Sequence, residues 1–216
     1  MSLIDDLLKE VSNSNCDVVS ILRKSLIISH KLDLKDTEKW IKNELQGYDE
    51  KEFIPEYRII KGTVKFHNPY HGWCPMIFDS IESENYFSRR KIIDSIPKCL
   101  DLISKEKGIL TMSFSPEVLK QFWRHNPSLQ METYLIIDRS SILDIIEMVK
   151  NEILNWGLLL SDKGITGDNI NFSIKEKEIA SSTPEIKNYY INISGNVENS
   201  QIQQNTLGST QITNKN

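Results

Sequence analysis

Side chains that could carry chemistry gather in one short segment, Phe66 to Pro75, with the sequence FHNPYHGWCP. His67 and His71 are four residues apart, and on a helix that spacing would place both rings on one face, where they could share a metal ion. The Asn-Pro pair between them and the glycine that follows favour a turn instead, and no glutamate follows His67 as a metalloprotease helix requires. We therefore expect no metal site here, but a loop whose aromatic residues pack over a sheet.

Cys74 could act as a nucleophile if a histidine beside it served as the base. The signatures that surround the catalytic cysteine in known protease families are absent from the sequence around it. The chain also lacks a glycine-rich phosphate loop of the Walker or dinucleotide type. The sequence thus identifies no catalytic residue. An enzymatic effector, such as a nuclease with a polar site around His67, His71, Trp73 and Cys74, stays an alternative.

The densest run of positive charge is SRRK, from Ser88 to Lys91. Arg89 and Arg90 could bind phosphate, so a nucleic-acid-binding module built on this run is a further alternative. The net charge of −4 does not favour attraction of the whole protein to nucleic acid. We expect the run to form a solvated turn at the beginning of a helix.

Length and composition indicate a single main domain in the cytoplasm. The 216 residues suffice for one domain of about 180 residues with a hydrophobic core, and for an appendage. Acidic residues lie where a signal peptide would have basic ones, and no run of about 18 apolar residues could insert the monomer into a membrane. The 3 cysteines lack the spacing of a zinc site or a disulfide framework, and we expect neither a metal nor a cofactor.

Apolar residues at helical spacing predict three helices in the N-terminal quarter. The first covers about residues 2–12, the second residues 17–31 and the third residues 36–46. The third helix should end at Gly47, because glycine readily adopts the left-handed conformation that follows many helices. We expect these helices to form a three-helix unit.

Beyond residue 55, short runs of β-branched and aromatic residues alternate with helical patterns. The expected elements are, in order, a strand at 57–66, a helix at 88–103 kinked by Pro97, a strand at 109–114, a helix at 116–124, a strand at 131–138 and a long amphipathic helix at 139–160. Helices followed by strands interleaved with helices indicate an α+β fold with a small mixed sheet.

The C-terminal part of the chain changes in composition. We expect a strand with a run of charges after Gly164, and a linker that begins with SSTPE at residues 181–185. The predicted organisation is an α+β domain at 1–180, a linker at 181–188 and a β-prone assembly tail at 189–216.

Three motifs of the main domain are similar to those of the AbiTii domain family of bacterial phage-defence proteins. They are PEYR at residues 55–58, the NPY-GW pattern at 68–73, and a helix around Trp156 that leads into the turn GITG at 164–167. The resemblance covers about residues 3–180 and implies a bacterial protein of abortive infection. It implies no catalytic residue. The motifs contain no activated nucleophile or ligand set, so we expect them to define the fold.

The tail is poor in charge and rich in Asn, Gln, Ser and Thr, yet its aliphatic residues are regularly spaced. Val197, Ile202, Leu207 and Ile212 are each five residues apart, within the pentads GNVEN, SQIQQ, NTLGS and TQITN. A period of five fits neither an α-helix nor a plain strand, and favours the short rungs of a β-solenoid. The tail is similar both to pentapeptide repeats and to the amyloid-signalling motifs attached to bacterial defence proteins.

One copy of this tail has too few apolar residues to fold alone. A buried aliphatic side chain contributes roughly 1.5 to 3 kcal/mol, whereas ordering each residue of the chain costs about 1 to 2 kcal/mol. We therefore expect several chains to fold together there, as a trimer or a higher homo-oligomer. The side chains expected at this contact are Ile191, Ile193, Val197, Ile202, Leu207 and Ile212.

Two further possibilities follow from the same tail and from the family. The tail could instead be a disordered, solubilising segment. If the protein acts in phage defence, its expected partners beyond its own copies are a phage component or another protein of the defence system. Binding to nucleic acid stays open.

Overall fold

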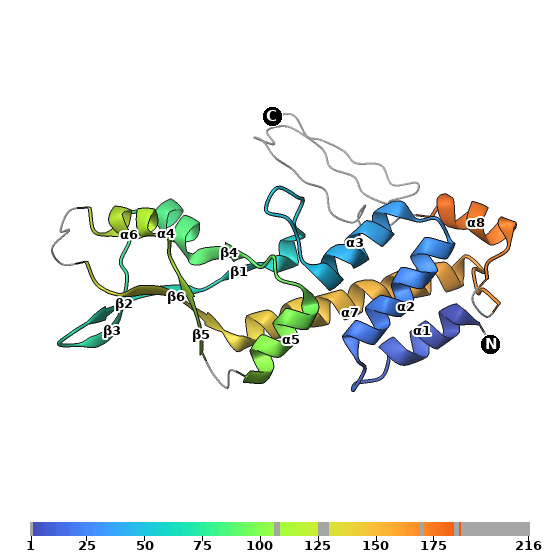
Figure 1. Ribbon diagram of the computed structural model, residues 1–216, viewed down its shortest axis with the longest axis horizontal. Coiled ribbons are helices and arrows are strands. Elements are labelled where there is room, and N and C mark those ends of the chain that lie inside the picture. The colour runs from blue at the N-terminus through green and yellow to red at the C-terminus, as the bar shows by residue number, and fades with distance from the viewer. Residues whose placement is uncertain (1, 106–108, 125–129, 169–170, 184–185, 187–216) are drawn as a thin grey trace, which may run out of the picture.

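The computed structural model describes residues 2–105, 109–124, 130–168, 171–183 and 186. Figure 1 shows an elongated molecule with a helical bundle at one end and a sheet with short helices at the other. Helices and antiparallel strands occur together, which confirms the expected α+β class. None of the helices in the described part of the chain is both long enough and apolar enough to span a membrane.

The N-terminal part of the bundle has the three helices that the sequence predicts. They are α1 (Leu3–Val11), α2 (Val18–Lys31) and α3 (Lys35–Gln46). Ser2 caps α1 by accepting a hydrogen bond from the backbone N–H of Asp5, and the Asp17 side chain caps α2 in a similar way. Helix α3 ends at Gly47, whose φ of 101° is a conformation that side chains with a Cβ rarely adopt.

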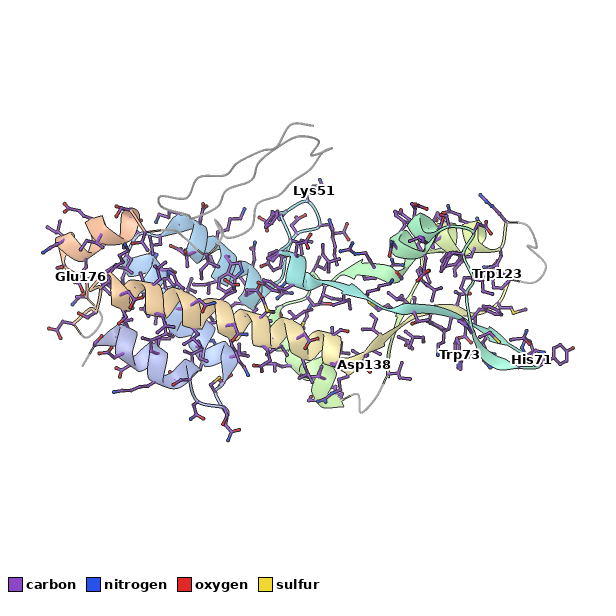
Figure 2. All side chains as sticks on the ribbon, turned by 180° about the vertical axis from the view of Figure 1, so that it is seen from behind. Lys51, His71, Trp73, Trp123, Asp138 and Glu176 are labelled. Atoms are coloured by element: carbon purple, nitrogen blue, oxygen red, sulfur yellow. The ribbon has the colours of Figure 1, made fainter. Side chains whose placement is uncertain are left out.

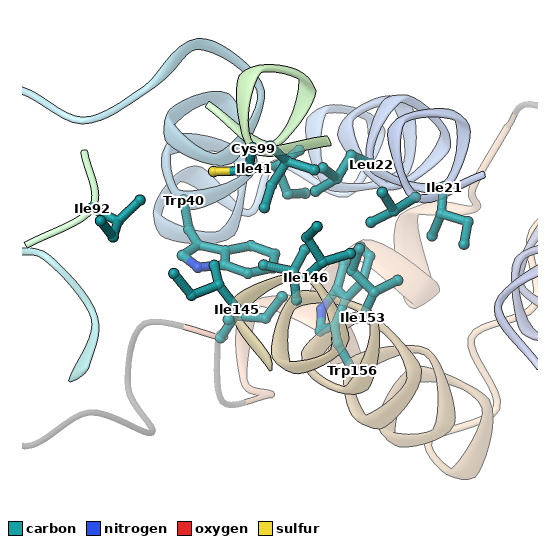
Figure 3. Close-up of a cluster of buried hydrophobic side chains, with 14 of the residues drawn as sticks. Ile21, Leu22, Trp40, Ile41, Ile92, Cys99, Ile145, Ile146, Ile153 and Trp156 are labelled. Carbon is teal, nitrogen blue, oxygen red and sulfur yellow. The ribbon is translucent and has the colours of Figure 1, made fainter. Parts of the chain in front are cut away.

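The long helix α7 (Arg139–Asp162) is the centre of the bundle. It packs against α1 and α2, and the shorter α5 (Ile96–Lys105) packs against both α7 and α3. The first three helices are therefore completed by α7, which the chain reaches only after the sheet. Figure 3 shows part of the shared core, where side chains from α2, α3, α5 and α7 meet: Ile21, Leu22, Trp40, Ile41, Cys99, Ile145, Ile146, Ile153 and Trp156.

A four-stranded sheet lies at the other end of the molecule. Its order is β3-β2-β6-β5, and the strands are β2 (Thr63–Asn68), β3 (Gly72–Pro75), β5 (Ile109–Ser113) and β6 (Thr133–Asp138). Each of these neighbours pairs in the antiparallel direction, so the described sheet is antiparallel and not mixed as the sequence suggested. The register places Val64 opposite Leu135, and both are buried. Phe66, on the same face, packs edge-on against Trp123 at the end of α6 (Pro116–Phe122). Helix α6 therefore covers this face of the sheet.

The strand expected at 57–66 is in fact divided between two sheets. A short 3-10 helix, η1 (Glu56–Arg58), leads into β1 (Ile59–Lys61), which pairs with β4 (Arg89–Lys91) in a separate two-stranded sheet. The break falls at Gly62, where a Cβ would lie 2.5 Å from the carbonyl oxygen of Ile136. Glycine therefore permits the close backbone approach at which the chain passes from one sheet to the other.

The prediction of a helix at 88–103 is wrong for the first half of this range. The chain forms α4 (Ile81–Ser88), then β4, and then α5, so the basic run is a strand. Pairing of β4 with β1 satisfies the backbone here, which outweighs the helical spacing of Ile92 and Ile96. Pro97 produces no kink, because it lies in the first turn of α5, where its missing N–H has no helical acceptor to lose.

The prediction of a strand after Gly164 is also wrong for the second half of that segment, which forms the helix α8 (Ile174–Ser181). Ser173 and Glu176 form a capping box, in which each side chain accepts a hydrogen bond from the backbone N–H of the other. The S-x-x-E spacing of these residues was the available signal for a helix start. The proposed division into domain, linker and tail stays a prediction, because most of the segment beyond Thr183 lies outside the described residues.

Candidate functional site

The segment around the two histidines is a tight β-hairpin that joins β2 to β3. The side chain of Asn68 accepts hydrogen bonds from the backbone N–H groups of Tyr70, at 2.8 Å, and His71, at 3.2 Å. Gly72 completes the turn with a φ of 71°. The turn expected from Asn68-Pro69 and Gly72 is therefore confirmed, but Tyr70 is 91% exposed and does not pack over the sheet as expected. Figure 2 shows His71 and Trp73 in this hairpin, at the opposite end of the molecule from Glu176.

The strand register divides the candidate polar residues between the two faces of the sheet. His67 lies directly opposite Trp73, with their ring centroids 5.2 Å apart, and Trp73 also contacts Tyr134 of β6. Cys74 lies opposite Phe66, and adjacent residues of a strand point to opposite faces. Cys74 is therefore on the helix-covered face, and the histidine and tryptophan are on the open one.

This arrangement does not bring the four side chains together. His71 lies in the exposed turn, beyond the ends of both strands. Among the residues that the structure describes, no group of three or more His, Cys, Asp or Glu side chains is placed to hold a metal ion. The open face offers an aromatic surface formed by His67, Trp73 and Tyr134.

Arg89 and Arg90 lie far from the hairpin along the chain, in β4. Arg90 is partly buried, and its Nη1 donates hydrogen bonds to the carbonyl oxygens of Phe87, at 3.4 Å, and Arg89, at 2.8 Å. Its guanidinium carbon lies 4.6 Å from the centroid of the Phe114 ring, a cation–π contact. Burial lowers the pKa of Arg90. The side chain of Arg89 is exposed.

A groove of about 490 Å³ opens over β4. Arg89, Arg90 and Lys91 contribute to it together with Tyr86 of α4 and Val118 of α6. The sequence indicated the basic residues, but it gave no sign of Tyr86 or Val118 because they reach the groove only through the tertiary fold. The structure therefore places the basic run in a concave, partly apolar site, where the sequence predicted a solvated turn.

The PEYR motif supplies a buried ion pair. Arg58 and Glu44 form a two-point contact with both side chains wholly buried, and Nε of Arg58 lies 3.1 Å from Oε1 of Glu44. The hydroxyls of Tyr48 and Tyr57 each donate to the same Oε1 at 2.6 Å. Burial and the neighbouring carboxylate raise the pKa of Tyr48, which keeps it a donor. Nη1 of Arg58 donates to the backbone of Ile92 and Asp94.

This ion pair therefore joins α3, η1 and the connection between β4 and α5. The sequence interpretation missed Glu44. An available signal was its position four residues after Trp40 and three after Ile41, on the inward face of α3. An acid at such a position requires a buried partner.

The GITG turn connects the two ends of the described domain. Gly164 ends α7 with a φ of 73°, and Ile165 beside it is fully buried. The Ser2 hydroxyl donates to the carbonyl oxygen of Thr166 at 2.8 Å. One carboxylate oxygen of Glu176 accepts from the backbone N–H groups of Thr166, at 3.0 Å, and Gly167, at 2.9 Å.

These contacts explain the Gly-Ile-Gly pattern as a structural joint between α1, α7 and α8. The candidate assembly residues of the tail, from Ile191 to Ile212, lie outside the described residues.

Taken together, the fold is that of an α+β protein with a helical bundle, a hairpin-ended antiparallel sheet and motif residues that hold these parts together. The family model named AbiTii matches residues 2–185. The chain belongs to the AbiTii family, which implies a role in abortive infection, a bacterial defence against phage. No curated protein and no solved structure matches the chain.

Proposed function

We propose that this AbiTii protein defends bacteria as a homo-oligomer whose C-terminal tail, residues 189–216, holds the copies together. The single observation that supports this function is the five-residue register of Val197, Ile202, Leu207 and Ile212. A segment with so few apolar residues does not offset its own ordering entropy, whereas copies that stack can share rungs and pair their amides. The protein acts in the bacterial cytoplasm, with its N-terminal domain at 1–180 carried by the assembled tails.

The roles of the family motifs support a protein that acts by binding and assembly. Arg58 of PEYR is used in an internal ion pair, and Gly164 and Gly167 are used in the joint between helices. The NPY-GW residues form a hairpin turn. Each motif thus has a structural use. A phage component or another defence protein is the partner that we infer for the assembled domains.

The assembly is tested by light scattering of the full-length protein and of a chain that stops at Ser182. The full-length protein should have the mass of a trimer or larger at micromolar concentration, and the shortened chain should be a monomer. Two charge-matched variants refine the test. Ile202→Asp with Leu207→Asp should disassemble the protein, because both positions belong to the apolar register. Gln203→Asp with Gly208→Asp adds the same charge outside that register and should disturb the assembly less.

The link to defence is tested by phage challenge of cells that express the same proteins. Protection should be lost with the shortened chain and with the Ile202→Asp, Leu207→Asp variant, and kept with the control. Equal masses for the full-length and shortened chains would contradict assembly through the tail. Protection by the monomeric shortened chain would show that defence does not need the oligomer.

A further inference from the structure

The groove over β4 has the features of a ligand site that none of the motifs accounts for. It has a volume of about 490 Å³ and lies between the segment of Glu50 and Ile54, helix α4 and helix α6. We propose that it binds a free nucleotide, with the basic side chains of Arg89, Arg90 and Lys91 on the phosphates and Tyr86 against the base. This site is independent of the tail and of its assembly.

Three cations and one acid, Glu50, line the groove, and none of the three cations forms an ion pair within the described part of the chain. There, no carboxylate lies within 4.0 Å of the charged nitrogens of Arg89, Arg90 or Lys91. Lys61, which lies opposite Arg89 in β1, is paired with Glu84 instead. Three adjacent cations beside one concave surface raise the local concentration of an anion and provide donors for it.

A second groove provides the comparison. It has a volume of about 500 Å³, is lined by α5 and β5, and contains Lys98 and Lys105. Each of these lysines forms an ion pair with the aspartate four residues before it, so their charge is already balanced. Of the two grooves, the one over β4 therefore fits an anionic ligand.

Arg90 is held in a position that suits phosphate binding. The carbonyl oxygens of Phe87 and Arg89 accept hydrogen bonds from Nη1, and the Phe114 ring supports the guanidinium. The other nitrogens, Nε and Nη2, have no hydrogen-bond partner within the described residues. A phosphate can accept hydrogen bonds from both nitrogens at once. A lysine has a single charged nitrogen and could not donate in this two-point geometry. An anion there would also offset the burial that lowers the pKa of Arg90.

Tyr86 provides the second half of the site. Tyr86 is 74% exposed, and its ring lies edge-on to the ring of the neighbouring Phe87, with the centroids 5.0 Å apart. An exposed aromatic ring of this kind is a surface on which a nucleobase can stack. The volume lies in the range of small-molecule sites, about 300 to 1,000 Å³. The net charge of −4 disfavours a long polyanion, so a free nucleotide fits better than a nucleic-acid strand.

The test is calorimetric titration of the full-length protein with ATP, adenosine and tripolyphosphate at low and high salt. ATP should bind more tightly than adenosine or tripolyphosphate, and its affinity should fall as salt rises. Arg89→Gln with Arg90→Gln should weaken ATP binding by at least about ten-fold. Tyr86→Ala should weaken ATP binding but leave tripolyphosphate binding unchanged, and Tyr86→Phe should bind ATP as the wild type does.

Lys175→Gln with Lys177→Gln is the matched control, because it removes the same charge from exposed positions of α8. It should bind ATP as the wild type does. Arg90 also packs on Phe114, so Arg89→Gln alone, at an exposed position, tests the charge without touching that packing. The assignment is overturned if ATP does not bind the wild type at low salt, or if the control loses as much affinity as the groove variant. Binding of a single-stranded oligonucleotide without binding of ATP would also overturn it.

Discussion

Arg58 and Glu44 are 14 residues apart in the chain and form an ion pair in the interior, where neither side chain has any exposed surface. The contact joins the helical bundle to the chain that enters the sheets. Two tyrosine hydroxyls and two backbone carbonyls complete its hydrogen bonds. A buried charge is tolerated only with such a full set of partners.

Replacement of Arg58 by methionine should therefore destabilise the protein strongly. The carboxylate of Glu44 would stay buried without its cation, which costs about 3 to 5 kcal/mol. The free energy of unfolding, measured by urea titration, should fall by this amount. The control is Lys105→Met, which breaks an exposed pair with Asp101 and should cost less than about 1 kcal/mol. Similar losses in the two variants would contradict the role of the buried pair.

Glu176 should make the stability of the protein depend on pH in the acid range. Burial opposes ionisation of its carboxyl, but hydrogen bonds from Gly167, Ser173 and Thr166 outweigh this and lower its pKa from 4.5 to about 2. Because the pKa is lower in the folded state, the stabilisation is present above the unfolded pKa. It is lost as the pH falls from about 4.5 to about 2.

The measurement compares the wild type with Glu176→Gln, which cannot ionise. Near neutral pH the variant should be less stable by about 1 kcal/mol, because it loses the charge at the start of α8 and in the capping box. The difference in unfolding free energy between the two proteins should shrink as the pH falls toward about 2. The other carboxyls titrate in both proteins, so they do not contribute to this difference. A difference that stays constant over this range would argue against the ionised Glu176 as the cause.

Gly167 and Gly164 offer a matched pair of substitutions in the GITG turn. Both have a positive φ, so alanine is strained at either position, at a cost of about 1 kcal/mol. At Gly167 the new Cβ would also lie 2.7 Å from the Phe172 ring, whereas at Gly164 it would meet nothing within 4 Å. Gly167→Ala should therefore lower the melting temperature more than Gly164→Ala. The extra drop in melting temperature caused by Gly167→Ala should be smaller in a protein that also carries Phe172→Leu. An equal drop with and without Phe172→Leu would show that contact with the Phe172 ring does not cause it.

The three cysteines should differ in reactivity. Burial raises the pKa of Cys99, which is 2% exposed, whereas Cys16 and Cys74 are partly exposed. A thiol-specific disulfide reagent should modify Cys99 in the native protein at least about ten-fold more slowly than the other two, and all three equally after unfolding. Cys99→Ala should leave the fast phase of the native reaction unchanged. Loss of that phase in the variant would show that Cys99 is accessible.

The helical bundle was predictable from the sequence because its signals are local. Apolar periodicity, the caps at Ser2 and Asp17 and the stop at Gly47 all act within a few residues, and α7 has apolar positions along its whole length. The hairpin turn at Asn68 was predictable for the same reason. The family motifs also pointed to the correct family.

The elements around β4 were not predictable, because partners distant in the chain decide them. Arg89 to Lys91 form a strand only because β1 offers free backbone groups, and β1 is separated from β2 by the single residue Gly62. The candidate polar residues of the hairpin look like one cluster in the sequence, but the period of two along a strand separates Cys74 from His67 and Trp73. The groove is likewise assembled from four segments that no local pattern connects.

Helix α1 cannot complete its packing during synthesis on the ribosome until α7 has been made. Helix α1 is among the first parts of the chain to be made, yet the surface that covers it is complete only at Thr166, roughly 150 residues later. At bacterial rates of synthesis that interval lasts about 8 to 30 s. Throughout it the apolar face of α1 can pack against α2, which follows it directly in the chain, but not against α7, so nascent chains of this protein should depend on chaperones until α7 has emerged.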